Sequence, residues 1–323
     1  MALYITKRVL MIILVVFCVV FIVFALVYSL PDSNIKAMPA YARGDFLDTV
    51  FSIINAKDNI VTKYIRYCYN IVFHFDFGRM GGVGGFPLAP ELTSRTRITL
   101  IVLACGACIT LAVGIPMGVY AATNKDRLFD RVINIITLVT SSIPYYATAL
   151  VIAIIFVLYL KVFPMSVRII KPSSFIMPTI TIGLAGISSI IRMTRTSMLE
   201  VLDQPYIIAL RAKGLRERSV ISQHALKNAM VPIISTFGIF VSQLVCGAFI
   251  VENFFTLRGL GAMMVRSIAS RSHYDLLGCI VIMTVIQAAM TIFSDVLYAI
   301  VNPRIKLQYS EISGIDKGVA YNG

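Results

Sequence analysis

The sequence carries little charge and few of the residues that catalysis uses. Only 14% of its 323 residues are charged, it has three histidines, and it has no tryptophan. It contains no G-x-x-x-x-G-K-[ST] phosphate loop, no H-E-x-x-H and no G-x-S-x-G. The three histidines, His74, His224 and His273, all lie outside the apolar runs, and no metal site or catalytic residue is predicted. Catalysis by this chain alone is not expected.

The cysteines do not form a disulfide framework. Cys105 and Cys108 make a C-x-x-C, but both lie in an apolar run long enough to cross a bilayer. Small, polarizable side chains are ordinary packing residues between helices. Cys68 is the one cysteine in the long polar segment 31–97, so it has no partner there for an intrachain bridge.

Apolar residues dominate the chain. They make up 58% of it, and the mean hydropathy is +0.84, well above the usual range of a soluble globule. A transmembrane helix needs about 20 mostly apolar residues. The sequence predicts an all-α, polytopic membrane protein with six spans, at 9–30, 98–122, 132–160, 176–198, 229–251 and 277–301. No A-x-A-like cleavage signal follows Leu30, so the first span is interpreted as a retained helix.

The distribution of Lys and Arg predicts the orientation. They gather at 7–8, 125–131, 192–227 and 304–317, which the positive-inside rule places in the cytoplasm together with both termini. The net charge of +13 therefore reflects topology. Because the basic residues are scattered between apolar spans and not massed on one face, binding to nucleic acid is not expected.

Some spans contain small residues and proline. Gly114 and Gly118 are spaced so that another helix can approach closely. Ser141, Ser142 and Pro144 predict a kink in the third span, which either is structural or lines a pathway. The ionisable residues of the spans lie towards their ends: Arg192, Arg195, Glu252 and Asp295. The lack of a midplane charge relay argues against an ion-coupled carrier.

A charged amphipathic stretch at 206–232 separates two spans. Asp203 is a predicted N-cap, Pro205 suits the first turn of a helix, and Gly214 interrupts that helix. After it, Ile221, Ala225 and Ala229 share one face. The polar residues outside this face are predicted to be solvated: Arg216, Glu217, Arg218 and Lys227. The pattern predicts helix, glycine turn and helix, which is either a docking element for a soluble partner or a solvated connector.

These residues also carry a family resemblance. The runs Arg195–Glu200, Arg211–Leu215 and His224–Ala229, followed by Pro232, resemble the cytoplasmic signature of binding-protein-dependent ABC transporter permeases. They are most similar to the dipeptide, oligopeptide and nickel branch. The resemblance implies that segment 203–228 couples the chain to an ATPase, through Arg211, Ala212, Lys213, Gly214, Leu215, His224, Ala225, Leu226 and Asn228. The general motif begins Glu-Ala-Ala, whereas this chain has Ile208-Ala209-Leu210, so no role is assigned to a glutamate.

The resemblance extends over nearly the whole chain. Glu252–Phe255 with Gly259-Leu-Gly261 resembles the segment after the fifth span, and Asp295–Tyr298 with Pro303-Arg304 resembles the terminal signature. Arg258 and Asn302 replace a common proline and aspartate, Asp76-Phe-Gly78 fits, and Pro31-Asp32-Ser33 approximates Pro-Gly-Asp. Structural or gating candidates are Pro144, Glu252, Gly259, Gly261 and Asp295, while the sequence identifies no substrate-binding residue.

The resemblance implies a type I ABC importer permease and a multi-subunit assembly. Its expected partners are a second permease, two ATPase subunits that hold ATP and Mg²⁺, an extracytoplasmic solute-binding protein and the lipid bilayer of a bacterial or archaeal cell. No cofactor is expected on this chain. Short peptides are the leading cargo, with oligosaccharides or nickel as alternatives. An ion-coupled carrier and a membrane scaffold without flux are the competing classes of function.

Four regions are expected. They are an N-terminal transmembrane helix at 1–30, an extracytoplasmic segment at 31–97, a transmembrane domain of five helices at 98–301 and a cytoplasmic tail at 302–323. Apolar and aromatic residues between 46 and 75 predict surface helices, forming either a cap for the binding protein or a packing domain. The glycines of 81–85 mark a hinge or a simple loop.

Overall fold

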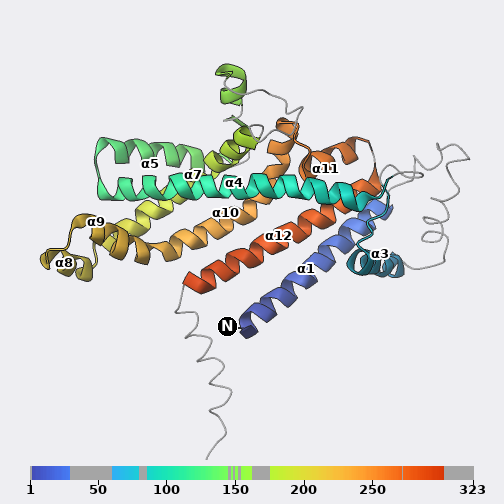
Figure 1. The fold of residues 1–323 in the computed structure, drawn as a ribbon, viewed down its shortest axis with the longest axis horizontal. Helices are drawn as coiled ribbons and strands as arrows, with labels where there is room; N and C mark the ends of the chain where they lie inside the picture. The colour runs from blue at the N-terminus through green and yellow to red at the C-terminus, as the bar shows by residue number, and fades with distance from the viewer. Residues whose placement is uncertain are drawn as a thin grey trace, which may run out of the picture. The chain divides into compact units, whose positions relative to one another are not determined.

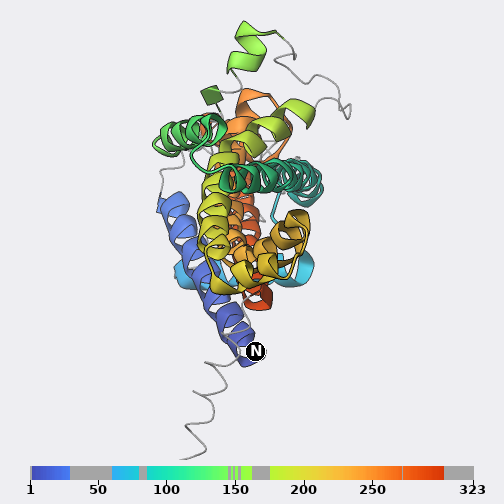
Figure 2. The same cartoon turned by 90° about the vertical axis from the view of Figure 1, so that its left-hand side faces the viewer.

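A computed structural model describes residues 2–29, 60–79, 86–144, 147, 150–151, 154–161, 175–270 and 272–301. In these ranges the chain is helical, apart from turns and one isolated antiparallel bridge between Arg79 and Pro87 (Figures 1 and 2). The long helices are α1 (Ala2–Ser29), α4 (Leu88–Thr123), α7 (Ile176–Leu202), α10 (Leu226–Phe254) and α12 (His273–Val301). The shorter ones are α3 (Ile60–His74), α5 (Leu128–Ser141), η2 (Ile155–Tyr159), α8 (Pro205–Ala212), α9 (Glu217–Ser219), η4 (Val220–Ala225) and α11 (Leu260–Ala269). The predicted all-α class is confirmed.

Five of the described helical segments are long and apolar enough to cross a membrane. They are Arg8–Leu26, Leu88–Thr123, Ile176–Leu202, Glu217–Phe254 and Tyr274–Tyr298. Five of the six predicted spans therefore have a counterpart among the described helices. The second begins earlier than its apolar run, because α4 includes the more polar residues 88–97.

The third predicted span, 132–160, is not one continuous helix. α5 ends at Ser141, before Pro144, which has no amide hydrogen to donate and restricts the residue before it. The hydroxyls of Ser141 and Ser142 each donate to the Leu138 carbonyl at 3.0 Å. These bonds satisfy a helix-end carbonyl, so the kink expected at Pro144 is a helix terminus.

The described residues divide into two compact units. Unit 1 is drawn from Met1–Leu10, Val102–Gly247 and Ala289–Gly323, and unit 2 from Met11–Ile101 and Ala248–Ala288. The long helices α1, α4, α10 and α12 each contribute to both units. The segments that carry the family resemblance around 195–232 all belong to unit 1.

Close helix packing through small residues holds unit 1 together. A Cβ added at Gly106, Gly114 or Gly118 of α4 would lie 2.5–2.9 Å from side chains of α7, and Thr110 of α4 donates to the Gly183 carbonyl of α7 at 2.8 Å. After the turn at 124–127, α5 folds back beside α4 and packs on α7 (Figure 1). The close approach predicted from Gly114 and Gly118 is confirmed, and α4 continues through Pro116 without a break.

Aromatic packing joins α3 to α1 in unit 2. Tyr64 is 1% exposed, its ring contacts Phe17, Phe21 and Phe24, and its hydroxyl donates to the Phe17 carbonyl at 2.6 Å. Burial raises the pKa of Tyr64 still further above neutral pH, so the phenol is protonated and can donate this bond. The helix predicted between 46 and 75 is thus found for residues 60–74. The remainder of that region and the glycines of 81–85 lie outside the described residues.

Candidate functional site

The site predicted at 203–228 begins with α8. Pro205 is its first residue, as predicted, but the N-cap is Gln204, with φ −72° and ψ 143°. Asp203 has helical angles and is the C-cap of α7 instead. The prediction that Asp203 caps the helix is therefore wrong by one residue. The reason is that α7 continues to Leu202, beyond its apolar run, so Asp203 is still within its last turn.

Gly214 ends α8 in a left-handed turn. Its φ is +78°, the Gly214 amide donates to the Arg211 carbonyl at 2.9 Å, and the Leu215 amide donates to the Leu210 carbonyl at 3.3 Å. This pair of bonds is the Schellman motif, in which glycine is preferred because a Cβ disfavours positive φ. Leu210 and Leu215 also pack on the same apolar cluster. The predicted glycine turn is confirmed.

The second half of the site is anchored to unit 1 by apolar residues. Ala225 and Ala229 are 0% and 1% exposed, and Ile221 packs against the cluster that they form with Ile207, Val220 and Met198. The predicted buried face is confirmed. The residues predicted to be solvated are exposed as expected: Arg216, Glu217, Arg218 and Lys227. Among the predicted coupling residues, Leu226 is partly buried against this cluster, whereas Ala212 and Lys213 are exposed.

Two polar contacts brace the turn from outside. Arg211 and Glu217 form a two-pronged ion pair across Gly214, with N–O distances of 2.7 and 3.1 Å. Asn228 donates to the Tyr206 hydroxyl at 2.9 Å and to the His224 carbonyl at 3.0 Å, which ties α10 to α8. Both contacts are exposed, so each contributes little to stability alone.

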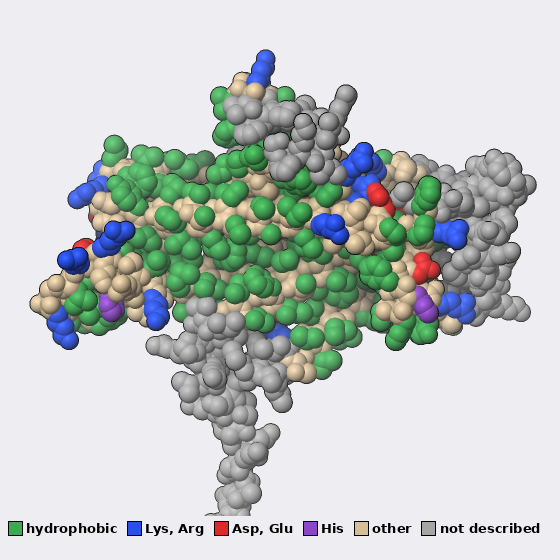
Figure 3. Space-filling view, viewed as in Figure 1, with side chains coloured by type: hydrophobic (Ala, Val, Ile, Leu, Met, Phe, Trp, Pro, Cys, Tyr) green, Lys and Arg blue, Asp and Glu red, His purple; other side chains and the backbone are tan. Residues whose placement is uncertain are grey.

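The outer surface of the site combines apolar and basic side chains. Ile208 is 60% exposed and Tyr206 is 41% exposed, while their neighbour Ile207 is fully buried. Lys and Arg side chains also gather over α8 and α9 (Figure 3). An exposed apolar residue ringed by positive charge is suited to docking on a surface with a groove and negative charge.

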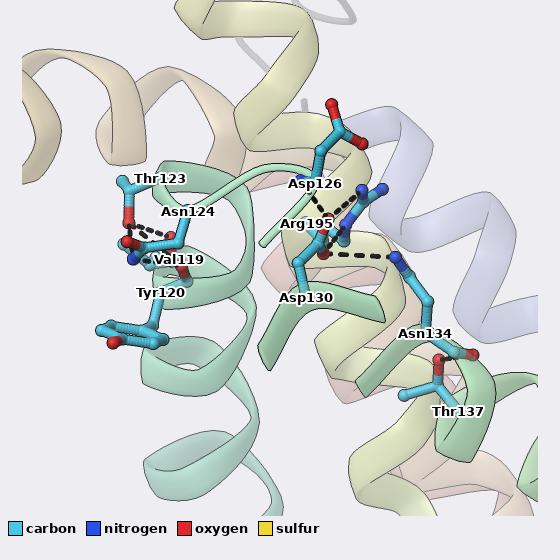
Figure 4. A network of polar contacts seen from close by, with 9 residues as sticks. All are labelled: Val119, Tyr120, Thr123, Asn124, Asp126, Asp130, Asn134, Thr137 and Arg195. Atoms are coloured by element: carbon cyan, nitrogen blue, oxygen red, sulfur yellow. Dashed lines mark hydrogen bonds and ion pairs between the residues drawn. The ribbon is translucent and has the colours of Figure 1, made fainter. Parts of the chain in front are cut away.

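A polar network lies at the contact between α5 and α7, and α7 is the helix that precedes α8 in the chain. Arg195 of α7 binds Asp130 of α5 through both carboxylate oxygens, at 2.5 and 2.8 Å (Figure 4). Asp130 is 1% exposed and also accepts hydrogen bonds from the Asp126 amide and the Asn134 side chain. The Arg195 guanidinium holds the pKa of Asp130 below its usual range. The resemblance singled out Arg195 but not Asp130, whose only sequence signal is a carboxylate at the edge of an apolar run.

The candidates after the fifth span come together in unit 2. Glu252 is fully buried, and one of its carboxylate oxygens accepts a hydrogen bond from the Gly261 amide at 2.8 Å. The adjacent Leu260 amide donates to the Thr99 hydroxyl at 3.0 Å, so the start of α11 is capped by side chains from elsewhere. A Cβ at Gly259 would strike the Glu252 carboxyl, which explains the glycine there.

The last two structural candidates belong to unit 1. Asp295 of α12 forms an ion pair with Arg8 of α1 at 2.8 Å. Pro144 follows the end of α5 and lines a cavity with residues of α7 and α10. Among the described residues, no cluster of three or more histidine, cysteine or acidic side chains could hold a metal ion.

The helical fold and the segment at 195–232 define a membrane-embedded transport component, and comparison with known families agrees. Residues 114–307 match the family of binding-protein-dependent transport system inner membrane components, and the chain belongs to this family. It is a multi-pass membrane protein and a permease subunit of an ABC importer.

Relatives of known description are similar over most of the chain. A putative peptide transport system permease of Brucella abortus (strain 2308) is 33% identical over 76% of this chain and 80% of its own length. A dipeptide transport system permease of Bacillus subtilis (strain 168) is 32% identical over 77% and 80%. An oligopeptide transport system permease of the same organism is 28% identical over 95% and 100%.

The fold has a counterpart among solved structures. A chain of the MetNI methionine ABC transporter in an inward-facing conformation superposes with a TM-score of 0.52 and 16% sequence identity. The match covers 65% of this chain and 96% of that one. The predicted type I importer permease fold is confirmed by this structural similarity together with the family match.

Proposed function

We propose that this chain forms half of the translocation pathway of an ATP-driven importer of di- and oligopeptides. The relatives described as peptide, dipeptide and oligopeptide permeases support this cargo. A second permease completes the pathway, a solute-binding protein delivers the peptide, and two ATPase subunits hold ATP and Mg²⁺. This chain itself holds no cofactor. Both of its termini lie on the cytoplasmic side of a bacterial or archaeal cell membrane.

The geometry of the segment 203–228 carries the proposal. It combines an exposed outer surface with a buried inner face that is continuous with α7 and α10. A displacement imposed on α8 by a partner is therefore transmitted to two long helices. The Schellman turn at Gly214 sets the angle between the outer helix and these inner ones. ATP-driven closure of the ATPases would move this segment and shift the population between the two access states of the pathway.

Substitution of Gly214 tests this coupling. A Cβ at Gly214 would meet nothing within 4 Å, so any defect arises from the positive φ and not from a clash. Gly214→Leu should distort the turn and reduce peptide uptake about 5- to 30-fold, since the left-handed conformation costs a residue with a Cβ roughly 1–2 kcal/mol. Uptake and ATPase activity are measured on the complete complex in proteoliposomes.

Gly214→Asn is the matched control, because asparagine tolerates left-handed backbone angles. It should retain most of the uptake. Equal, near-parental uptake in both variants at normal membrane insertion would contradict the coupling role. Failure of the unmodified complex to take up peptide on adding ATP would contradict the proposed function as a whole.

A further inference from the structure

A cavity of about 470 Å³ lies within unit 1, between the end of α5 and one face each of α7 and α10. Its volume is in the range of small-molecule binding pockets, about 300–1,000 Å³. Several of its lining residues have polar side chains, beside the apolar Ile143, Pro144 and Ala185: Thr140, Ser141, Ser188, Ser189, Arg192 and Gln243. Such a lining is unusual in the apolar part of a membrane protein, where each polar group must be satisfied or used.

The polar residues of α7 are arranged to face this cavity. Ala185, Ser188, Ser189 and Arg192 all line it, at the i, i+3, i+4 and i+7 spacing of one helix face. Within the described residues, the hydroxyls of Ser188 and Ser189 make no side-chain hydrogen bond. They are therefore available to donate to a molecule in the cavity.

The side chain of Arg192 is exposed and extends towards the N-terminal part of α7. Side chains of a helix tilt towards its N-terminus, and Arg192 lies about 15 Å of helix rise before the C-terminal end of α7 at Leu202. Its guanidinium donates to the Ser141 hydroxyl at 3.3 Å, consistent with this direction. The sequence placed Arg192 towards the end of a span, and the side chain extends from there towards the N-terminal part of α7.

The charge of Arg192 has no carboxylate partner in the part of the chain that the structure describes. Its neighbour Arg195, one turn further on, is paired by Asp130 through two short contacts. None of the described residues that line the cavity is acidic, so the guanidinium lies beside several hydroxyls and one amide. A guanidinium at such a site binds a carboxylate with strong, directional hydrogen bonds.

We propose that this cavity is a binding station for cargo in the translocation pathway, and that Arg192 pairs there with the C-terminal carboxylate of a short peptide. The hydroxyls of Ser188 and Ser189 donate to the same carboxylate. The other residues that line the cavity are uncharged and so do not select for the charge of the peptide's own side chains, which suits a transporter of varied peptides. This inference rests on the proposed function as a peptide importer.

Protection of Cys246 tests the binding step without the solute-binding protein. Cys246 lines the cavity and is exposed, so its alkylation by a small thiol reagent reports occupancy. In the complex used for this test, the other five cysteines of this chain are replaced, so that Cys246 alone remains. The two probes are the tripeptide Ala-Ala-Ala and the same tripeptide with a C-terminal amide. The free acid should slow alkylation at concentrations about 10–100-fold lower than the amide, and Arg192→Gln should abolish that difference.

Arg131→Gln is the control, since Arg131 is an exposed arginine of α5 outside the cavity. It should leave the difference between the probes unchanged, whereas Arg192→Lys should keep part of it. Equal protection by acid and amide, or unchanged protection in Arg192→Gln, would overturn the inference.

Peptide uptake by the same complex separates the two proposals. If the parental complex and the Arg192→Gln complex take up peptide equally well, the role of Arg192 is overturned but the proposed function is not. If the parental complex takes up no peptide at all, the proposed function fails.

Discussion

Asp130 is the carboxylate on which the contact between α5 and α7 depends. It is nearly inaccessible to water and accepts hydrogen bonds from Arg195, Asn134 and the Asp126 amide. Removing one partner of such a pair leaves the other charge poorly solvated, at a cost of about 3 kcal/mol or more. Asp130→Asn should therefore lower the apparent Tm of the purified protein in detergent by several degrees.

Replacing both partners provides the comparison. In Asp130→Asn with Arg195→Met no charge remains unpaired, so most of the lost stability should return. A double variant as unstable as the single one would show that the pair acts through packing and not through charge.

The same pair predicts a pH dependence on the acid side. Because Arg195 lowers the pKa of Asp130 in the folded state, the stabilisation is fully present above the unfolded value of about 3.9. It is lost as the pH falls through the lowered pKa. The Tm difference between the parental protein and Asp130→Asn should be constant from pH 8 to 5 and shrink below about pH 4. A difference that shrinks near pH 6 would point to another titrating group.

At the scale of the helices, small residues determine how closely α4 approaches α7. A Cβ at Gly118 would lie 2.8 Å from the Ile191 carbonyl oxygen, which belongs to the backbone and cannot rotate away. Alanine favours helix over glycine by about 1 kcal/mol, so Gly118→Ala would stabilise an isolated helix. In the packed protein we expect the opposite, a loss of about 1–3 kcal/mol from overpacking.

Thermal unfolding in detergent distinguishes these outcomes. Ala104→Val is the matched control, as it adds volume to an exposed position of the same helix. It should change the Tm little. A more stable Gly118→Ala protein would mean that the two helices are free to move apart.

Local patterns predicted the elements better than their ends and their partners. The small residues of α4 and the left-handed Gly214 are local requirements of sterics, and both were predictable. The end of α5 before Pro144 was predicted as a kink, because periodicity does not reveal whether a helix resumes after proline. The pairing of Asp130 with Arg195 joins residues 65 positions apart, and no local pattern carries that information.

At the scale of the whole molecule, two neighbouring residues of α8 have different roles, one in the stability of the fold and the other in docking to a partner. Ile207 is fully buried in the apolar cluster of unit 1, whereas Ile208 is 60% exposed on the outer surface. An exposed, branched apolar side chain next to basic residues is a suitable anchor for the ATPase subunits proposed above. Truncation of such an anchor typically costs 2 kcal/mol or more of binding free energy, about 30-fold in affinity.

Ile208→Asp should therefore reduce recovery of the ATPase chains with the tagged permease at least tenfold, while its own Tm stays near the parental value. Ile207→Asp should instead lower the Tm strongly, because it buries a carboxylate in the cluster. Mild-detergent pull-down with quantitative mass spectrometry measures the first effect, and thermal unfolding measures the second. Full recovery of the ATPases with Ile208→Asp would move the docking surface away from α8. A fall in Tm with both substitutions would mean that α8 packs against the chain on both faces and has no surface free for a partner.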